Sequence, residues 1–240
     1  MAALGQLAGG VAHEINNLLQ PVITLSELAG EDLAADFDAA ATAEMRESLA
    51  IVTKCGRDAR EIVRKILRYA RKEVPTLEPT PMGDTLKSSI ELVRSLLSPG
   101  IALTTQVSAE AGGVARMNGA EMTQIVTNLA VNADHAMKGQ GKLTIGLERR
   151  ASPELEGFPP ELPAGEYFVI RAADNGSGMD AATRARIFDP FFTTKPLGQG
   201  TGLGLSMVHG ILKSWNGAIA VTSEVGKGTE FRLYIPVAKA

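Results

Sequence analysis

Apolar residues recur at spacings of three and four over the first 70 residues of the chain. The first run consists of Leu4, Leu7, Val11, Ile15, Leu18, Val22 and Leu25, and the second of Met45, Leu49, Val52, Gly56, Ala59, Val63, Ile66 and Ala70. Such seams are typical of helices that bury one face against other helices. Residues 30–38 (GEDLAADFD) separate the runs and predict the turn of a helical hairpin. One hairpin would leave much of each seam exposed, so we expect two chains to form a four-helix bundle.

The pattern changes after residues 75–84 (PTLEPTPMGD), which are rich in proline and predict a linker. We then expect helices over 84–97, 120–137 and 202–215, strands over 101–107, 142–148 and 167–174, and a closing hairpin from GAIAVTSE and GTEFRLYIP. Residues 151–165, with four of the twelve prolines, predict an exposed loop. This order fits a mixed sheet covered by helices on one face. The sequence thus predicts an α+β chain divided into residues 1–74, a linker at 75–84 and residues 85–240.

Composition narrows the function classes. The net charge of −3 gives no reason to expect nucleic acid or an anionic membrane surface as a partner. The single cysteine, Cys55, excludes an internal disulfide and a multi-cysteine metal site, which favours a reducing compartment. No apolar run approaches the ~18 residues of a membrane span. We therefore expect a cytoplasmic segment without membrane contact, although the full-length protein could be anchored upstream.

The motif AHEINN in the first helix carries the first candidate reactive residues. With about 100° per residue and Val11 at zero, His13 falls near about 200° and Asn17 near about 240°. Both side chains are therefore expected to point away from the apolar seam, one turn apart, with Glu14 at its boundary. A packed core histidine is not expected here. A reactive histidine and a solvated surface histidine remain the two interpretations.

Four motifs in the second half predict a nucleotide site. In NLAVN, the amides of Asn128 and Asn132 share a helix face and could coordinate Mg²⁺ without repelling a triphosphate. In DNGSGMD (174–180), Asp174 could accept hydrogen bonds from an exocyclic amine beside two glycines. GQGTGLGLS (198–206) runs into a helix, an arrangement typical of anion sites. FDPFFTTK (188–195) predicts a lid latch or docking surface.

Simpler interpretations stay open for each motif. The asparagines could lie on an ordinary helix surface, DNGSGMD could be a plain turn, and FDPFFTTK could pack its own small core. GSGMDA also matches the dinucleotide pattern G-x-G-x-x-A, but no full helix and second parallel strand follow it. GQGTGLGLS lacks the P-loop pattern.

Together the motifs resemble the catalytic core of the sensor histidine kinases of two-component signalling. AHEINN resembles the phosphoacceptor box, NLAVNA the asparagine box, DNGSGM the first glycine box, FDPFF the phenylalanine box, GTGLGL the second glycine box and GKGTEF the closing glycine motif. The resemblance implies an N-terminal dimerisation and phosphotransfer hairpin. It also implies an ATP-binding domain with an α/β sandwich, of the type shared with Hsp90, MutL and gyrase.

The resemblance also implies roles for single residues. His13 would be the phosphoacceptor, with Glu14 orienting its imidazole and Asn17 placed to help remove phosphate from a partner. Asn132 would hold Mg²⁺ and Asp174 would read adenine. The other implied ATP-binding residues are Asn128, His135, Gly176, Gly178, Thr193, Thr194, Lys195, Gly200, Thr201, Gly202, Leu203, Gly204, Leu205 and Thr229. His135 stands where many family members carry Lys, Leu18 where many carry Pro, and the 151–165 insertion has no implied role.

The expected function follows from these roles. It is ATP- and Mg²⁺-dependent autophosphorylation of a homodimer on His13, followed by phosphoryl relay to an aspartate of a response-regulator receiver domain, fused or separate. Phosphatase activity toward that regulator is a possible addition. The alternatives are a non-kinase ATPase of the same nucleotide fold, and a signalling scaffold or phosphatase with degenerate kinase activity.

Overall fold

The computed structural model divides into two compact units, Met1–Val74 and Pro75–Ala240. It describes residues 19–20, 22–24, 26–27, 46–47, 49–54, 56–57, 59, 77–108, 111–152, 158–195 and 202–238. Five predicted site residues lie outside this described part, namely His13, Glu14, Asn17, Gly200 and Thr201.

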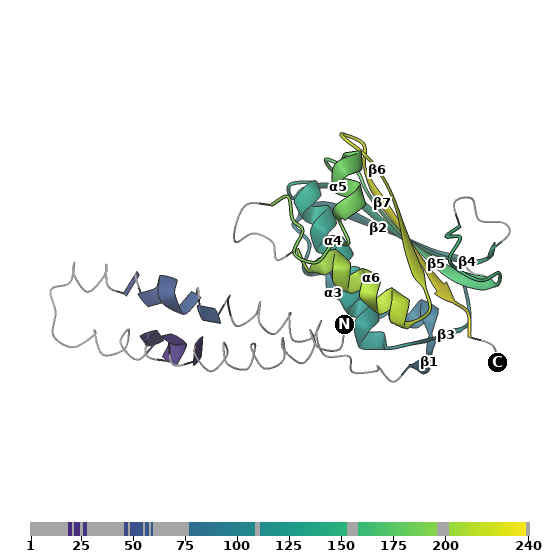
Figure 1. Ribbon diagram of the computed structural model, residues 1–240, viewed down its shortest axis with the longest axis horizontal. Helices are drawn as coiled ribbons and strands as arrows, with labels where there is room; N and C mark the ends of the chain where they lie inside the picture. The colour runs from purple at the N-terminus through teal and green to yellow at the C-terminus, as the bar shows by residue number, and fades with distance from the viewer. Residues whose placement is uncertain are drawn as a thin grey trace. The chain divides into compact units, whose positions relative to one another are not determined.

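In the first unit, the described residues of both seams are helical. Ile23 is buried, and a Cβ added to Gly56 would lie 2.7 Å from its Cγ1, so the two helical segments pack closely there. An ion pair of 2.6 Å between Arg57 Nη2 and Glu27 Oε1 joins the same segments. Their described parts are the purple and blue ribbons of Figure 1. The seam residues Val22 and Val52 remain 44% and 41% exposed. The single hairpin therefore leaves apolar seam positions uncovered.

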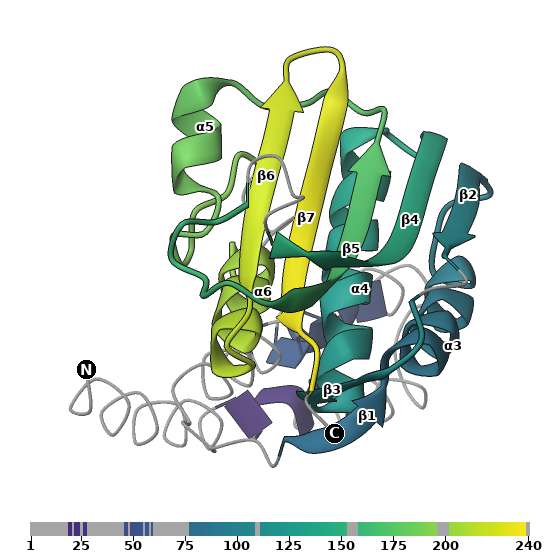
Figure 2. The ribbon, with the colours of Figure 1, turned by 90° about the vertical axis from the view of Figure 1, so that its right-hand side faces the viewer.

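The second unit contains a five-stranded mixed sheet, as the sequence predicted. Its strand order is β2 (Gly100–Val107), β4 (Gln140–Ala151), β5 (Glu166–Asp174), β7 (Gly228–Pro236) and β6 (Ala218–Glu224). Only the β2–β4 pair among these is parallel. Helices α3 (Met82–Arg94), α4 (Gly119–Ala136) and α6 (Gly204–Ser214) cover one face of this sheet, and the short α5 (Ala181–Arg186) lies at its edge (Figures 1 and 2).

The core of this unit lies between the sheet and the helices because alternate strand residues face the same side. The buried strand residues of this face are Leu143, Ile145, Leu147, Phe168, Ile170, Ala172, Phe231, Leu233 and Ile235. From the helices they meet Leu86, Ile90, Val93, Ile125, Leu129, Val208 and Leu212. This packing fixes α4 and α6 against the sheet, and the ends of these elements form the site described below.

The predicted linker at 75–84 is wrong from residue 78 onward. Strand β1 (Glu78–Pro81) pairs antiparallel with β3 (Val114–Met117), and α3 begins at Met82. Proline is tolerated in β1 because an edge strand does not need every backbone N–H for pairing. These residues therefore belong to the folded second unit.

The predicted exposed loop at 151–165 is confirmed for residues 160–165, which lie outside helices and strands and are mostly exposed, but not for its beginning. Residue 151 still belongs to β4, and Phe158 packs edge-on against Tyr167 and Tyr234, with ring centroids 5.2 and 5.7 Å apart. These tyrosines project from the sheet face opposite the helices, where they form a second cluster with Val169. The described part of the insertion thus covers an aromatic patch that would otherwise face water.

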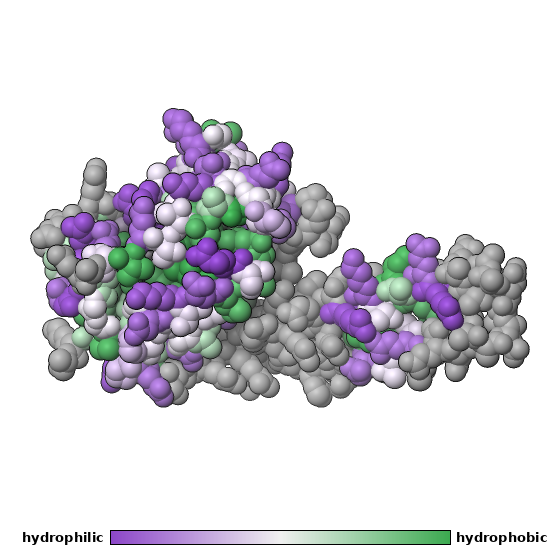
Figure 3. All heavy atoms as spheres, turned by 180° about the vertical axis from the view of Figure 1, so that it is seen from behind, coloured by the Kyte–Doolittle hydropathy of each residue, from purple (hydrophilic) through white to green (hydrophobic). Residues whose placement is uncertain are grey.

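None of the described helices is both long and apolar enough to span a membrane. Seen from behind, the surface of the second unit mixes polar and apolar side chains (Figure 3). Leu92, Leu96 and Val131 are among its exposed large apolar residues.

Candidate functional site

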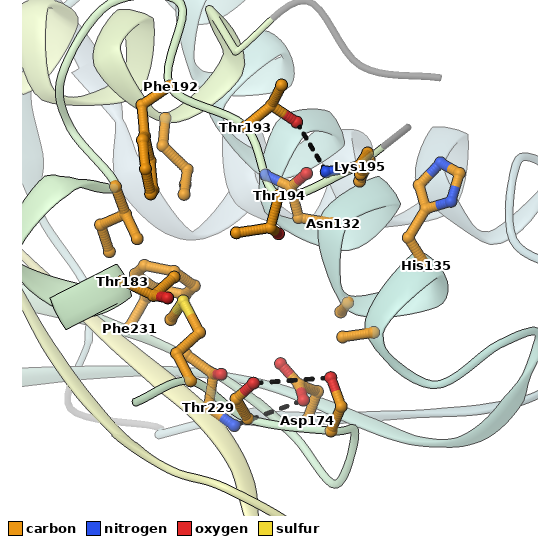
Figure 4. A pocket seen from close by; sticks show the side chains of 17 residues that line it. Asn132, His135, Asp174, Thr183, Phe192, Thr193, Thr194, Lys195, Thr229 and Phe231 are labelled. Atoms are coloured by element: carbon orange, nitrogen blue, oxygen red, sulfur yellow. Dashed lines mark hydrogen bonds between the residues drawn. The ribbon is translucent and has the colours of Figure 1, made fainter. Parts of the chain in front are cut away.

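A pocket of about 350 Å³ lies among α4, the loop after β5, α5, residues 192–195 and β7 (Figure 4). Its lining residues are Asn132, Ala133, His135, Ala136, Asp174, Ser177, Gly178, Met179, Thr183, Ile187, Phe192, Thr193, Thr194, Lys195, Leu205, Thr229 and Phe231. Nine of the residues that the sequence singled out are therefore brought together here. Asn128, Gly176, Gly202, Leu203 and Gly204 do not line the pocket.

Asp174 and Thr229 lie side by side at one end of the pocket (Figure 4). Asp174 Oδ1 accepts hydrogen bonds from the N–H groups of Gly176, at 2.8 Å, and Thr229, at 3.3 Å. Within the described part of the chain, Oδ2 has no partner and can accept from a ligand. Burial raises the pKa of the Asp174 carboxyl, against the opposing effect of the two N–H groups. The carboxylate is thus held rigidly and partly desolvated, as recognition of a polar edge requires.

The positions of Gly176 and Gly178, after Asp174, need glycine because neighbouring backbone leaves no space for a Cβ. Gly178 adopts φ +64°, and a Cβ there would overlap the carbonyl oxygen of Glu224. A Cβ on Gly176 would lie 2.8 Å from the carbonyl carbon of Ala136 at the end of α4. The loop is therefore pressed between α4 and the β6–β7 turn, and this contact directs the Asp174 end of β5 into the pocket.

The amides of Asn128 and Asn132 meet the N-terminus of α6. A Cβ on Gly204 would lie 3.4 Å from Asn128 Oδ1 and 3.9 Å from Asn132 Nδ2. The N-cap residue of α6, Leu203, has an apolar side chain that forms no capping hydrogen bond, and the first turn of α6 contains no acidic residue. The Nδ2 atom of Asn128 is buried without a partner in the described part of the chain. A helix N-terminus beside amide groups is suited to bind an anion such as a phosphate.

The same corner fits a magnesium ion bound mainly by a nucleotide. The described residues contain no cluster of three carboxylate, histidine or cysteine side chains that could hold a metal alone. Mg²⁺ often takes one or two protein oxygens and completes its shell with phosphate oxygens and waters. The Asn132 amide oxygen could serve as such a ligand.

A backbone hydrogen bond joins Phe191 to Gly202. The N–H of Phe191 donates to the carbonyl oxygen of Gly202 at 3.1 Å, and both residues have positive φ, +67° and +64°. The arm that leaves this point carries Thr193, Thr194 and Lys195 into the pocket (Figure 4). Burial lowers the pKa of the Lys195 ammonium. The loop thus places a cation and two hydroxyls at the end of the pocket away from Asp174.

The two phenylalanines at 191 and 192, in the predicted latch segment, lie in different environments. Phe192 lines the pocket, and the Arg186 guanidinium carbon lies 4.4 Å from its ring centroid. Phe191 is 59% exposed.

His135 lies at the pocket wall and is exposed to solvent, so its position fits both a contact with phosphate and a solvated side chain.

Several lining residues were not among the site residues predicted from the sequence. Met179, Ile187 and Phe231 form apolar walls around the Asp174 end, and Thr183 adds a hydroxyl from α5. Phe231 could have been placed by strand alternation, two residues after Thr229. The α5 residues gave no signal because α5 is only six residues long.

Comparison with known proteins agrees with this geometry. Residues 117–239, more than half of the chain, match the family model for histidine kinase-, DNA gyrase B-, and HSP90-like ATPase. The chain belongs to this ATPase family. Residues 3–75 match the His Kinase A (phospho-acceptor) domain. The two matches together identify the catalytic core of a two-component sensor histidine kinase.

Curated relatives and solved structures extend the agreement. The chain is 37% identical over 239 residues to sensor kinase CckA of Brucella abortus (strain 2308), covering 98% of this chain and 24% of that protein. It is 29% identical to sensor histidine kinase ZraS of Salmonella typhi, covering 99% of this chain and 46% of that protein. Full-length ShkA in complex with AMPPNP matches with a TM-score of 0.72 and 25% identity, over 98% of this chain and 46% of that one. The chain thus spans between a quarter and a half of these relatives' lengths.

Proposed function

We propose that the chain transfers the γ-phosphoryl group of Mg·ATP to His13 and then relays it to an aspartate of a response-regulator receiver domain. The observation that carries this proposal is that the two ends of the pocket differ in charge and in hydrogen-bonding groups. A fixed carboxylate acceptor stands at one end, and a cation, amides and the N-terminus of α6 stand at the other. A purine with an exocyclic amine suits the first end, and a triphosphate suits the second.

The base would lie against the apolar walls of Met179, Ile187 and Phe231, with its amine directed to Asp174 Oδ2. Guanine would present a keto oxygen at that position, which the carboxylate would repel. The pocket therefore favours adenine nucleotides. The AMPPNP bound by ShkA is an analogue of the same class of nucleotide.

The phosphates would extend toward Asn132, Lys195 and the start of α6. Lys195 and the helix N-terminus would stabilise the negative charge that spreads over the phosphoryl oxygens during transfer. Asn132 would hold the Mg²⁺ ion, which supplies further charge neutralisation when bound. Positioning and charge stabilisation account for most of phosphoryl-transfer catalysis, so few side chains need to react.

His13 would be the nucleophile. A neutral ring nitrogen attacks the γ-phosphorus, a nitrogen–phosphorus bond forms, and the bond to the bridging oxygen breaks to release ADP. Glu14 would hold the other ring nitrogen in the right tautomer and help to accept its proton. In the relay, the phosphoryl group passes from this nitrogen to a carboxylate oxygen of the regulator, which restores the imidazole.

The proposal assigns the first unit, residues 1–74, to dimerisation and phosphotransfer and the second unit, residues 75–240, to ATP binding. The exposed seam residues Val22 and Val52 support a homodimer formed through the first unit. The regulator could be fused or separate, and we place the reaction in the cytoplasm. Asn17, one turn from His13 in the sequence pattern, is proposed to orient a water that hydrolyses the regulator's aspartyl phosphate.

Incubation with γ-labelled ATP tests the main step. We expect acid-labile, base-stable label on the protein, lost in His13→Gln and retained in the control His209→Gln. The ring of His209 packs against Phe188, with the two ring centroids 5.4 Å apart. Label on His13→Gln equal to that on the parent would show that His13 is not the acceptor. Release of free phosphate without protein label would instead indicate a simple ATPase, and neither product would indicate a scaffold.

The phosphatase role has its own test. Phosphorylated regulator is mixed with ADP and either the parent or Asn17→Ala, and its decay is followed. We expect slower decay with the variant at an unchanged rate of autophosphorylation. Equal decay, with clear phosphatase activity in the parent, would remove Asn17 from the mechanism.

A further inference from the structure

Ser223, near the end of β6, makes hydrogen bonds to two segments that shape the Asp174 end of the pocket. It is 8% exposed and does not itself line the pocket. Its Oγ accepts the N–H of Met179 at 2.9 Å. The same oxygen lies 3.0 Å from the carbonyl oxygen of Gly228 and 2.9 Å from Thr229 Oγ1. One buried hydroxyl thus joins the glycine loop to the start of β7.

The number of hydrogens decides how these bonds are directed. A serine hydroxyl has one hydrogen to donate and two lone pairs to accept with. The Gly228 carbonyl can only accept, so the bond to it needs the Ser223 hydrogen. The bond between Ser223 and Thr229 must then be donated by Thr229. This arrangement satisfies all three contacts with the hydrogens available, whereas the reverse arrangement leaves the Gly228 contact without a hydrogen.

The direction of the Thr229 hydroxyl determines what the pocket offers to a ligand. Thr229 lines the pocket beside Asp174, and its N–H is already used by Asp174 Oδ1 (Figure 4). With its hydroxyl hydrogen directed to Ser223, Thr229 presents only lone pairs to the pocket. Thr229 Oγ1 and Asp174 Oδ2 are then two neighbouring acceptors at this end of the pocket.

We propose that Ser223 is a positioning residue that sets base selectivity, by holding Thr229 as an acceptor so that the pocket favours amino-purine over keto-purine nucleotides. This inference rests on the proposed nucleotide function of the same pocket. An amine can donate to Asp174 or, directly or through a water, to Thr229. A keto oxygen would face two acceptors and lose its hydrogen bonds with water without replacement, which is the costly case in recognition.

The test compares affinities for the non-hydrolysable imido analogues of ATP and ITP by calorimetric titration. Ser223→Ala frees the Thr229 hydroxyl to turn its hydrogen toward a keto oxygen. We expect the ratio of ATP to ITP affinity to fall about tenfold relative to the parent. General loosening of the fold would weaken both nucleotides and leave the ratio unchanged, so the ratio separates selectivity from stability.

Ser89→Ala is the matched control. Ser89 is 1% exposed, and its Oγ likewise contacts a carbonyl oxygen, that of Thr85, and a threonine hydroxyl, that of Thr123, each at 2.9 Å. It lies between α3 and α4 and does not line the pocket. We expect the same loss of a buried hydroxyl there to leave the nucleotide ratio at the parent value.

A second substitution closes the test. Thr229→Val removes the hydroxyl that Ser223 is proposed to direct, so Ser223→Ala should change the ratio no further in that background. The inference would be overturned if the two substitutions change the affinity ratio independently, so that their effects multiply in the double variant. It would also be overturned if a folded Ser223→Ala leaves the ratio unchanged. In both cases ATP binding by the parent would still support the proposed function. If Ser223→Ala does not fold, Ser223→Cys takes its place, with a smaller expected change. A parent that binds neither nucleotide would overturn both.

Discussion

Asp174→Asn changes one atom at the base-recognition end of the pocket, and its effect can be derived from the structure. Asp174 Oδ1 accepts two backbone N–H groups, from Gly176 and Thr229. An asparagine has one side-chain oxygen, which must take this position to keep both bonds. Its NH₂ group is then placed where Oδ2 faces the pocket. The substitution therefore turns a ligand acceptor into a donor while the local fold is kept.

The size of the effect follows from the lost bond. A hydrogen bond from a ligand amine to a charged acceptor contributes about 1.5–3 kcal/mol, and about 1.4 kcal/mol corresponds to tenfold in affinity. With the amine facing a donor instead, we expect affinity for the ATP analogue to fall by about ten- to a hundredfold. Affinity for the ITP analogue should rise relative to that for ATP, because the keto oxygen can accept from the new NH₂ group.

The pH dependence of stability and of nucleotide affinity provides a second test of the role of Asp174. Burial raises the pKa of Asp174, so the folded protein holds this proton more strongly than the unfolded chain. The protonated form contributes stability that is present below the ordinary aspartate pKa and is lost as pH rises through the raised pKa. Nucleotide affinity should show the opposite trend and weaken as pH falls through the raised pKa. Both trends should be absent in Asp174→Asn.

Calorimetric titration at several pH values, with urea unfolding of the free protein, measures both quantities. Asp134→Asn is the control, because its Oδ2 accepts from the N–H and Oγ of Ser98, at 3.0 and 2.9 Å, and it does not line the pocket. Unchanged affinity for the ATP analogue in a folded Asp174→Asn would refute the reasoning, since the proposed amine acceptor would then contribute nothing.

Three further predictions concern the framework. Gly178→Ala should lower the free energy of unfolding by about 3 kcal/mol or more, against about 1 kcal/mol for Gly226→Ala, because both have positive φ but only Gly178 lacks space for a Cβ. Trp215→Phe should cost about 1–2 kcal/mol in urea unfolding, because Trp215 Nε1 donates to Glu121 Oε2 at 2.9 Å. Val52→Glu should shift the mass measured by light scattering from dimer to monomer, because an apolar seam residue would become charged.

Each has an outcome that contradicts it. Equal destabilisation by Gly178→Ala and Gly226→Ala would show that the overlap with Glu224 relaxes freely. A Trp215→Phe variant as stable as the parent would mean that water replaces the indole donor without loss. For the dimer, Lys54→Glu introduces the same side chain, with a larger change of charge, at a neighbouring position outside the predicted seam. A mass unchanged by Val52→Glu, or lowered equally by Lys54→Glu, would argue against the seam as the interface.

The longer elements of the second unit could be predicted from periodicity alone. The helix expected at 120–137 is observed as Gly119–Ala136, and the strand expected at 167–174 as Glu166–Asp174. These segments bury a continuous face, and the period of their apolar residues records that burial directly. Strands β1 and β3 were missed because each has four residues, β1 contains two prolines, and their pairing joins positions as far apart as Glu78 and Met117.

The same division applies to the site. The sequence alone determined which residue types were available for nucleotide chemistry, because Asp174, the glycines and the two asparagines stand in motifs whose spacing is local. Only the tertiary structure decided how they act. Asp174 is held by a backbone N–H from β7, and Ser223 reaches Met179 from 44 residues away in the chain. Such contacts are made by strands and loops that meet only after the sheet forms, so they leave no periodic trace in the sequence.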